Sequence, residues 1–152
     1  MSTLSEHIIG VIGAGSFGTV LANVMAENAP VLLLARRQEV ADRITESRKH
    51  KGQDIHPNIR LTTSIEEIAN RCQLIVPVIP SVSFGKMLNE LAPFLKPSHI
   101  LIHATKGLDI TVPEGESLQT LEMIDRKHVK TMSELIYERT VVKRVGCIAG
   151  PN

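Results

Sequence analysis

The stretch His7-Ile-Ile-Gly-Val-Ile-Gly-Ala-Gly-Ser-Phe-Gly-Thr19 sets three closely spaced glycines directly after a short apolar run. That run, residues 7–12, has the length of a strand, and residues 17–27 carry apolar side chains at helical spacing. A Gly-x-Gly-x-x-Gly sequence between a strand and a helix is typical of a loop that holds the pyrophosphate of a dinucleotide. The alternative is a glycine-rich turn without a ligand, and the placement of these glycines makes it the weaker interpretation.

Each residue of this loop has an expected role. Gly13 permits the tight turn, Gly15 lets the pyrophosphate approach the backbone, and Gly18 allows the helix to pack closely on the strand. The N-terminus of the helix offers N–H groups and a partial positive charge to the phosphates. Ser16 adds a hydroxyl donor, and Phe17 is expected to cover the cofactor.

Apolar runs of strand length alternate with helix-period segments along the rest of the chain, which is typical of βαβ units. We therefore predict an α/β fold with a Rossmann-like, doubly wound, mostly parallel sheet, in a single domain of residues 1–152. A capping box of Ser64 and Glu67 starts one helix, and strand pairing is expected to end or bulge near Pro77. The other predicted strands are 30–35, 59–62, 74–79, 100–104 and 141–149, and the other predicted helices are 39–48 and 82–95.

Two segments have a less regular pattern. Residues 51–58 predict a polar loop, and residues 107–139 mix short apolar groups with polar stretches. In the second segment we predict two amphipathic helical pieces, marked by Leu118, Leu121 and Ile124 and by Met132, Leu135 and Ile136.

Composition excludes several classes of function. The net charge is only +1, so no strong field favours nucleic acid or acidic membranes as partners. The apolar runs are of strand length, so we expect neither a signal peptide nor a membrane span. Cys72 and Cys147 are isolated and are expected to be buried, reduced thiols of a cytoplasmic protein. We expect no metal site, because His99 and His103, four apart in one strand, would lie about 13 Å from each other.

The residues after the second predicted strand bear on the choice of cofactor. An acidic residue there would bind the ribose 2′-hydroxyl of NAD, whereas arginine accommodates the 2′-phosphate of NADP. This chain has Arg36 and Arg37, with no acid before Glu39. Two guanidinium groups can hold a phosphate by charge-assisted bonds, so the sequence favours NADP, or the use of both NADP and NAD. The alternative is that both are solvated residues of a first helical turn.

Two further strand ends carry candidate residues. Pro80 is expected to hold a rigid turn against the nicotinamide side, and Ser81 to cap the next helix. Lys106 follows an apolar strand, where it could pair with an anionic substrate or polarise a carbonyl; an ordinary strand-end lysine is the other interpretation.

Several blocks occur together in one order, and the series resembles the N-terminal domain of NAD(P)-dependent glycerol-3-phosphate dehydrogenase of the soluble bacterial type. The resemblance runs from about residue 7 to residue 152, and its most specific parts are the Ala-Thr-Lys-Gly and Gly-Pro-Asn blocks. The blocks are Val11-Ile-Gly-Ala-Gly-Ser-Phe-Gly-Thr19, Ala35-Arg-Arg37, Ile75-Val-Pro-Val-Ile-Pro-Ser81, His103-Ala-Thr-Lys-Gly-Leu-Asp109 and Ala149-Gly-Pro-Asn152.

The resemblance implies reversible reduction of dihydroxyacetone phosphate to sn-glycerol 3-phosphate for glycerophospholipid synthesis. It places Ser16, Phe17, Arg36 and Arg37 on cofactor positions. It also places Lys106 on a lysine that touches both cofactor and substrate.

The same resemblance implies that Gly150 and Asn152 begin a substrate-contacting loop. The principal acid/base lysine of the family lies in a helical C-terminal domain that this chain lacks, and a homodimer is an expectation for the full-length enzyme. We therefore expect these 152 residues to be a fragment that binds cofactor without turnover.

Two other functions stay open on the sequence alone. One is a related NAD(P)-dependent reductase of hydroxy or keto acids, built on the same cofactor domain. The other is a non-catalytic module that senses NAD(P)H.

Overall fold

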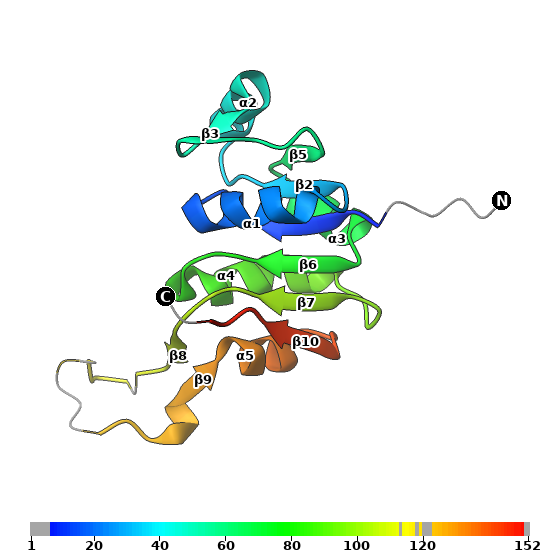
Figure 1. Cartoon of the computed structure of the whole chain (residues 1–152). Helices are drawn as coiled ribbons and strands as arrows, with labels where there is room; N and C mark the ends of the chain where they lie inside the picture. Colours follow the sequence, from blue (N-terminus) through cyan, green and yellow to red (C-terminus); the bar gives the residue numbers. More distant parts are fainter. Residues whose placement is uncertain (1–6, 113, 118, 120–122, 151–152) are drawn as a thin grey trace.

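A computed structural model describes residues 7–112, 114–117, 119 and 123–150 of the chain, and six parallel strands form its main sheet (Figure 1). Their spatial order is β10-β7-β6-β1-β2-β5, so the chain starts at the centre and winds outward in both directions. This is the strand order of the doubly wound Rossmann fold, as predicted. The strands are β1 (Ile9–Ile12), β2 (Val31–Leu34), β5 (Ile59–Thr62), β6 (Leu74–Pro77), β7 (Ile100–His103) and β10 (Arg144–Cys147).

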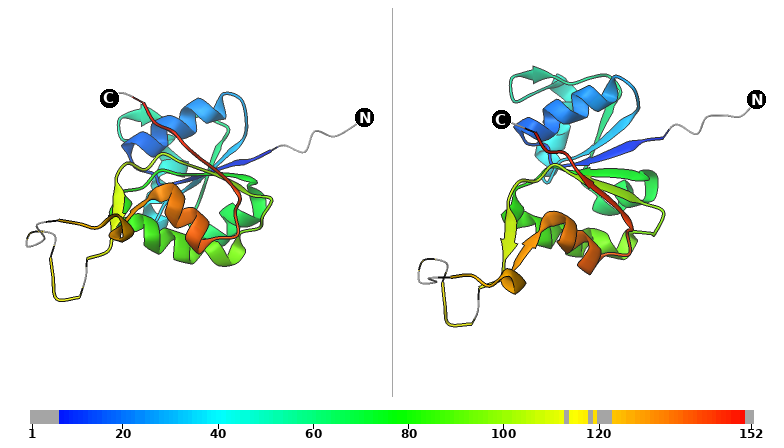
Figure 2. Two further views of the ribbon diagram at one scale, coloured as in Figure 1. Left: turned by 90° about the horizontal axis from the view of Figure 1, so that it is seen from below. Right: turned by 60° about the horizontal axis from the view of Figure 1, so that its bottom comes forward.

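Helices cover the sheet from both sides, which is why strands such as β2 are apolar along their length (Figure 2). One layer holds α1 (Ser16–Ala26) and α2 (Gln38–Ser47), and its core includes Ala22, Leu33 and Ile44. The opposite layer holds α3 (Ile65–Arg71), α4 (Ser81–Leu91) and α5 (Met132–Arg139), packed around Phe84 and Leu101.

The parallel arrangement brings the carboxyl ends of all six strands to one edge of the sheet. The strand register shows this alignment, since Ile12, the last residue of β1, pairs with Leu34 at the end of β2 and with Pro77 at the end of β6. The glycine loop and the residues that follow β2, β6, β7 and β10 therefore meet at the same edge, where ligands of open α/β sheets bind.

Two small antiparallel strand pairs were not predicted from the sequence. β3 (Lys49–His50) directly precedes the segment predicted as a polar loop, and β4 (Gln53–Asp54) lies within that segment and pairs antiparallel with β3. Lys51 and Gly52 join them with positive φ angles of 51° and 77°, as in a type I′ turn. Farther along, β8 (Leu108–Ile110) pairs antiparallel with β9 (Val129–Thr131).

Three predictions about helix ends differ from the structure. Ser64 caps α3 by accepting from the Glu67 N–H at 3.1 Å, but the Glu67 carboxylate binds the Thr62 hydroxyl and Arg71, so the predicted capping box is only half formed. Pro80, and not Ser81, occupies the cap position of α4. That helix ends at Leu91, and a 3-10 turn, η1 (Ala92–Phe94), completes the longer segment that was predicted.

The less regular segment is described in part. The predicted helical piece around Met132, Leu135 and Ile136 is confirmed as α5, with all three side chains buried. Leu118 and Leu121 of the other predicted piece lie outside the described residues, and the described part after them forms a 3-10 turn, η2 (Arg126–His128). The fourth predicted strand ends at Pro77, as expected.

The two cysteines differ in environment, which corrects the expectation that both are buried. Cys72 is only 1% exposed, and burial raises the pKa of its thiol to about 11. Cys147 is exposed, because it ends an edge strand that has a neighbour, β7, on one side alone.

We therefore expect iodoacetamide at pH 8 to alkylate Cys147 rapidly in the folded protein and Cys72 only after unfolding, since the thiolate is the reactive form. Peptide mass spectrometry of native and urea-treated samples measures both rates. Equal labelling of the two thiols in the native sample would contradict this placement of the cysteines.

Within the part of the chain that the structure describes, no helix combines the length and apolar character needed to cross a membrane. The same residues contain no group of three His, Cys, Asp or Glu side chains arranged to hold a metal ion.

Candidate functional site

The glycine loop has two positions where only glycine fits. Gly13 adopts a φ of +119°, and a Cβ there would overlap the carbonyl oxygen of Val78. A Cβ on Gly18 would overlap the Gly13 carbonyl oxygen and lie 3.1 Å from its carbon. These two glycines thus serve the tight turn and the close packing of α1 that the sequence predicted.

Gly15 differs from both. Its φ of −81° suits any residue, and a Cβ built on it would meet no atom within 4 Å. The packing of the described chain therefore gives no reason for glycine at this position. Open space beside a backbone that carries no side chain is what a pyrophosphate group needs in order to approach, so the loop fits a dinucleotide.

The start of α1 faces the same open space. Gly15 is its cap residue, with no side-chain hydrogen bond to the helix, and no acidic side chain stands in the first turn. The first N–H groups of an 11-residue helix are thus available to an anion. Ser16 and Phe17 form this first turn and are exposed, Phe17 at 51%.

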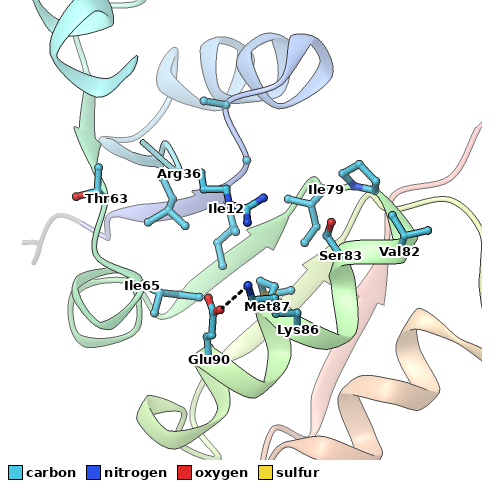
Figure 3. Close-up of a pocket in the computed structure, with 14 residues that line it drawn as sticks. Ile12, Arg36, Thr63, Ile65, Ile79, Val82, Ser83, Lys86, Met87 and Glu90 are labelled. Carbon is cyan, nitrogen blue, oxygen red and sulfur yellow. Dashed lines mark ion pairs between the residues drawn. The ribbon is translucent and has the colours of Figure 1, made fainter. Parts of the chain in front are cut away.

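A cavity of about 440 Å³, which we call the wide cavity, opens beside the loop (Figure 3). Its floor is largely aliphatic, with Ile12, Ile65 and Ile79 among the side chains that turn toward it, while a Lys86–Glu90 ion pair of 3.9 Å lies on α4 at its rim. A flat apolar base can be buried on such a floor. The other lining residues are Gly13, Ala14, Leu34, Arg36, Thr63, Pro80, Val82, Ser83 and Met87.

A second cavity of about 280 Å³, the basic cavity, shares the lining residues Ala14 and Arg36 with the wide cavity. Among the described residues, Arg36 is the only charged one that lines both cavities. Arg37 lines the basic cavity alone, and its guanidinium lies 3.6 Å from the Glu39 carboxylate. The basic cavity is lined by Ala14, Gly15, Ala35, Arg36, Arg37, Val40, Arg43, His50 and Lys51.

Pro80 and Lys106 lie on two loops that are fastened together. The Thr105 hydroxyl donates to the Ile79 carbonyl at 2.8 Å, and Gly107 packs so closely on Ser81 that a Cβ would lie 2.9 Å from its hydroxyl oxygen. Lys106 is exposed at the carboxyl edge and lines neither cavity, whereas Pro80 lines the wide cavity together with Arg36. The expected position of Pro80 on the nicotinamide side stays a prediction.

The chain returns to this edge after β10. The Ile148 N–H donates to the His103 carbonyl at 2.9 Å, which extends the pairing with β7 by one residue, and Gly150 two residues later is exposed. Asn152, the other residue predicted to contact substrate, lies outside the described residues.

Three histidines are buried, and each has a hydrogen-bonding partner. His50 in β3, predicted to lie in a loop, has its Nε2 2.9 Å from the Ala14 carbonyl oxygen. The Nε2 of His99 lies 2.9 Å from the Ala69 carbonyl oxygen, and that of His103 2.9 Å from the Ser133 hydroxyl. Burial lowers the pKa of His103, whose ring packs edge-on against Phe84, and so favours the neutral imidazole.

Thr105 and three residues of the basic cavity, Arg43, His50 and Lys51, were not predicted as site residues from the sequence. The Lys51-Gly52 pair between short polar segments was an available signal for a hairpin turn. Nothing local to Arg43 or Thr105 indicates their positions, because these depend on packing between distant segments.

Comparison with known proteins agrees with this geometry. The family model described as the N-terminus of NAD-dependent glycerol-3-phosphate dehydrogenase matches residues 8–152. The glycerol-3-phosphate dehydrogenase of Halalkalibacterium halodurans is 34% identical over 151 residues, which are 95% of this chain and 39% of that protein. The Pseudomonas aeruginosa enzyme is also 34% identical, over 97% of this chain and 40% of its own length. The solved Saccharomyces cerevisiae enzyme, at 19% identity, superposes with a TM-score of 0.76 over 96% of this chain and 42% of its own, which shows the shared fold.

Proposed function

The chain belongs to the NAD-dependent glycerol-3-phosphate dehydrogenase family, and we propose that it provides the cofactor site of an enzyme that reversibly reduces dihydroxyacetone phosphate to sn-glycerol 3-phosphate. The observation that carries this proposal is the open face of Gly15, which lines the basic cavity, next to Ala14, which lines both cavities. The chain spans 39% and 40% of the two curated relatives above, so the complete reaction belongs to the proposal.

The residues of this chain divide the work of binding. The backbone from Gly13 to Gly18 and the start of α1 would hold the pyrophosphate, and Ser16 and Phe17 would border it. The wide cavity, which includes Pro80, would take the adenine base. The nicotinamide, when bound, supplies a hydride to the carbonyl carbon of the substrate.

Lys106 is the residue of this chain proposed to act on the substrate. The Thr105–Ile79 hydrogen bond fixes its loop at the carboxyl edge while its ammonium group stays exposed. There it would orient the phosphorylated substrate and polarise the carbonyl, with Gly150 and Asn152 in the neighbouring segment. The principal acid/base lysine is proposed to come from a helical C-terminal domain.

A turnover assay on the 152-residue chain with NADPH and dihydroxyacetone phosphate tests this division. We expect saturable binding of NADPH and no turnover. When loaded with NADPH, the Lys106→Ala variant should bind dihydroxyacetone phosphate more weakly than the unmodified chain does. Lys96→Ala is the matched control, because this exposed lysine precedes β7 at the opposite edge of the sheet. Reduction at an enzymatic rate by this chain alone would show that no further base is needed.

NADP is the proposed preference. Arg36 lines both cavities, so it stands where the adenine pocket meets the basic cavity. Arg37 contributes charge to the same cavity, although its guanidinium also pairs with Glu39. Both can form charge-assisted bonds to a 2′-phosphate, and NADH offers no such group.

Arg36→Ala is expected to weaken NADPH binding by tenfold or more, on the order of one charge-assisted bond to phosphate, and NADH binding by a few-fold. Arg37→Ala should have a smaller effect on NADPH, because this side chain is 69% exposed and shared with Glu39. Titration by calorimetry measures both, with Arg60→Ala, an exposed arginine of β5 that lines neither cavity, as the control. Equal losses for NADPH and NADH would count against recognition of the 2′-phosphate.

The proposal also includes the setting of the enzyme. A cytoplasmic location is supported by the two free thiols, Cys72 and Cys147, and small-molecule partners by the net charge of +1, which gives no attraction to nucleic acid. From the resemblance of the sequence to this family, we also propose that the full-length enzyme is a homodimer and that it supplies glycerol 3-phosphate for glycerophospholipid synthesis.

A further inference from the structure

The β3–β4 hairpin places a lysine at the basic cavity, and its role is not explained by the fold. Lys51 stands at the tip of the hairpin with a φ of +51°, in the left-handed region that glycine and asparagine occupy more readily. Lysine gains nothing there from the turn itself. A residue that is disfavoured by its own backbone and lines a cavity is a candidate for a functional role.

Three contacts fix this hairpin against the rest of the domain. The Asn23 side chain of α1 donates to the Asp54 carbonyl at 2.8 Å and accepts from the His56 N–H at 2.9 Å. The Arg48 guanidinium, at the end of α2, donates to the Ile59 carbonyl at 3.1 Å and to the carbonyls of Ile55 and His56. These two contacts therefore hold β4 and the segment that follows it against α1 and the end of α2.

The third contact joins the hairpin to the glycine loop. His50 is 8% exposed, and its Nε2 donates to the Ala14 carbonyl at 2.9 Å, since a carbonyl oxygen can only accept. Ala14 lies between Gly13 and Gly15, in the proposed pyrophosphate site, and His50 directly precedes Lys51 in the chain. The imidazole of His50 therefore links the glycine loop to the tip of the hairpin. The positions of Lys51 and of the glycine loop are thus coupled through one side chain.

The charge of the cavity identifies the ligand chemistry. Four cationic side chains line it, namely Arg36, Arg37, Arg43 and Lys51, and no Asp or Glu is among its described lining residues. Repulsion among these cations is relieved by an anion of more than one charge, and a phosphate monoester carries between about −1.5 and −2 at pH 7. A ribose hydroxyl does not relieve it.

We propose that the hairpin acts as the specificity element for the adenosine 2′-phosphate, with Lys51 as the contact and His50 as the positioning residue. This rests on the proposed function and deepens it, because it assigns the discrimination between NADPH and NADH to a segment beyond the arginine pair that follows β2. Arg43 of α2 completes the cationic wall on the helix side.

Lys51→Asn tests the contact, since asparagine suits the left-handed turn but lacks the ammonium group and the length of the lysine side chain. We expect the 152-residue chain to lose about tenfold in affinity for NADPH and for adenosine 2′,5′-bisphosphate. Affinity for NADH and for AMP should stay within about twofold. Lys49→Ala is the matched control, because Lys49 stands two residues away, pairs with Asp54 at 3.9 Å and does not line the cavity.

His50→Leu tests the positioning. This variant should have a lower ratio of NADPH affinity to NADH affinity than the unmodified chain. His50→Gln can still donate a hydrogen bond to the Ala14 carbonyl, so its ratio should equal that of the unmodified chain. A purely structural role would weaken both cofactors alike and leave the ratio unchanged.

Each other outcome is decisive. If Lys51→Asn weakens NADPH and NADH equally, the lysine serves the pyrophosphate and the inference is wrong. If the unmodified chain prefers NADPH but Lys51→Asn binds NADPH as tightly as the unmodified chain does, the hairpin does not recognise the 2′-phosphate. The proposed function would then still stand. If the unmodified chain binds neither cofactor, the proposed function fails as well.

Discussion

Gly18→Ala is expected to destabilise the domain by about 3 kcal/mol or more, which is a large share of the 5–15 kcal/mol typical of a domain. The added Cβ would overlap the Gly13 carbonyl oxygen and lie 3.6 Å from the Val78 Cβ. The overlap is with backbone, which cannot rotate away as a side chain would, so α1 would have to move off β1. Urea unfolding followed by circular dichroism measures the loss.

Gly52→Ala provides the comparison for that experiment. Gly52 has a φ of +77° but no atom within 4 Å of an added Cβ, so only the backbone preference, about 1–2 kcal/mol, opposes the change. Equal stability of Gly18→Ala and the unmodified chain would mean that the contact between the helix and the turn is looser than described.

Gly15→Ala, unlike Gly18→Ala, is expected to keep the stability of the fold and to lose affinity for the cofactor. The backbone at Gly15 is compatible with alanine and the new Cβ meets no atom within 4 Å, so the free energy of unfolding should change by less than about 1 kcal/mol. The methyl group would occupy the space through which the pyrophosphate approaches the helix N-terminus. Affinity for NADPH and NADH should fall together, by about a hundredfold.

Parallel measurement of unfolding and of cofactor titration on Gly15→Ala separates these effects. A variant that binds both cofactors as the unmodified chain does would show that the pyrophosphate lies elsewhere. A variant that fails to fold would show that Gly15 serves the protein's own packing.

The central part of the fold could be predicted because its signals are local. Strand β2 is a continuous apolar run covered on both faces, and the Gly13–Gly18 loop stands between an apolar strand and an amphipathic helix. The predicted strands extended up to a few residues too far, as at residues 141–149 against the observed Arg144–Cys147, because apolar side chains also flank the paired segment.

The remaining features depend on contacts between distant segments. β3 and β4 have two residues each, too few for a periodic pattern, and the anchors of the hairpin, Asn23 and Arg48, lie on other elements. The basic cavity combines the residues after β2 with α2 and the hairpin, so sequence could indicate Arg36 and Arg37 but not Lys51. Exposure of Cys147 follows from the position of β10 at the edge of the sheet, which composition does not reveal.

Calorimetric titration of the unmodified 152-residue chain with NADPH and with NADH tests the central claim, that the glycine loop and the basic cavity form one dinucleotide site with a preference for the 2′-phosphate. We predict one saturable site for each cofactor and at least about tenfold tighter binding of NADPH, which corresponds to about 1.4 kcal/mol. Binding of neither cofactor, or equal or tighter binding of NADH, would contradict it.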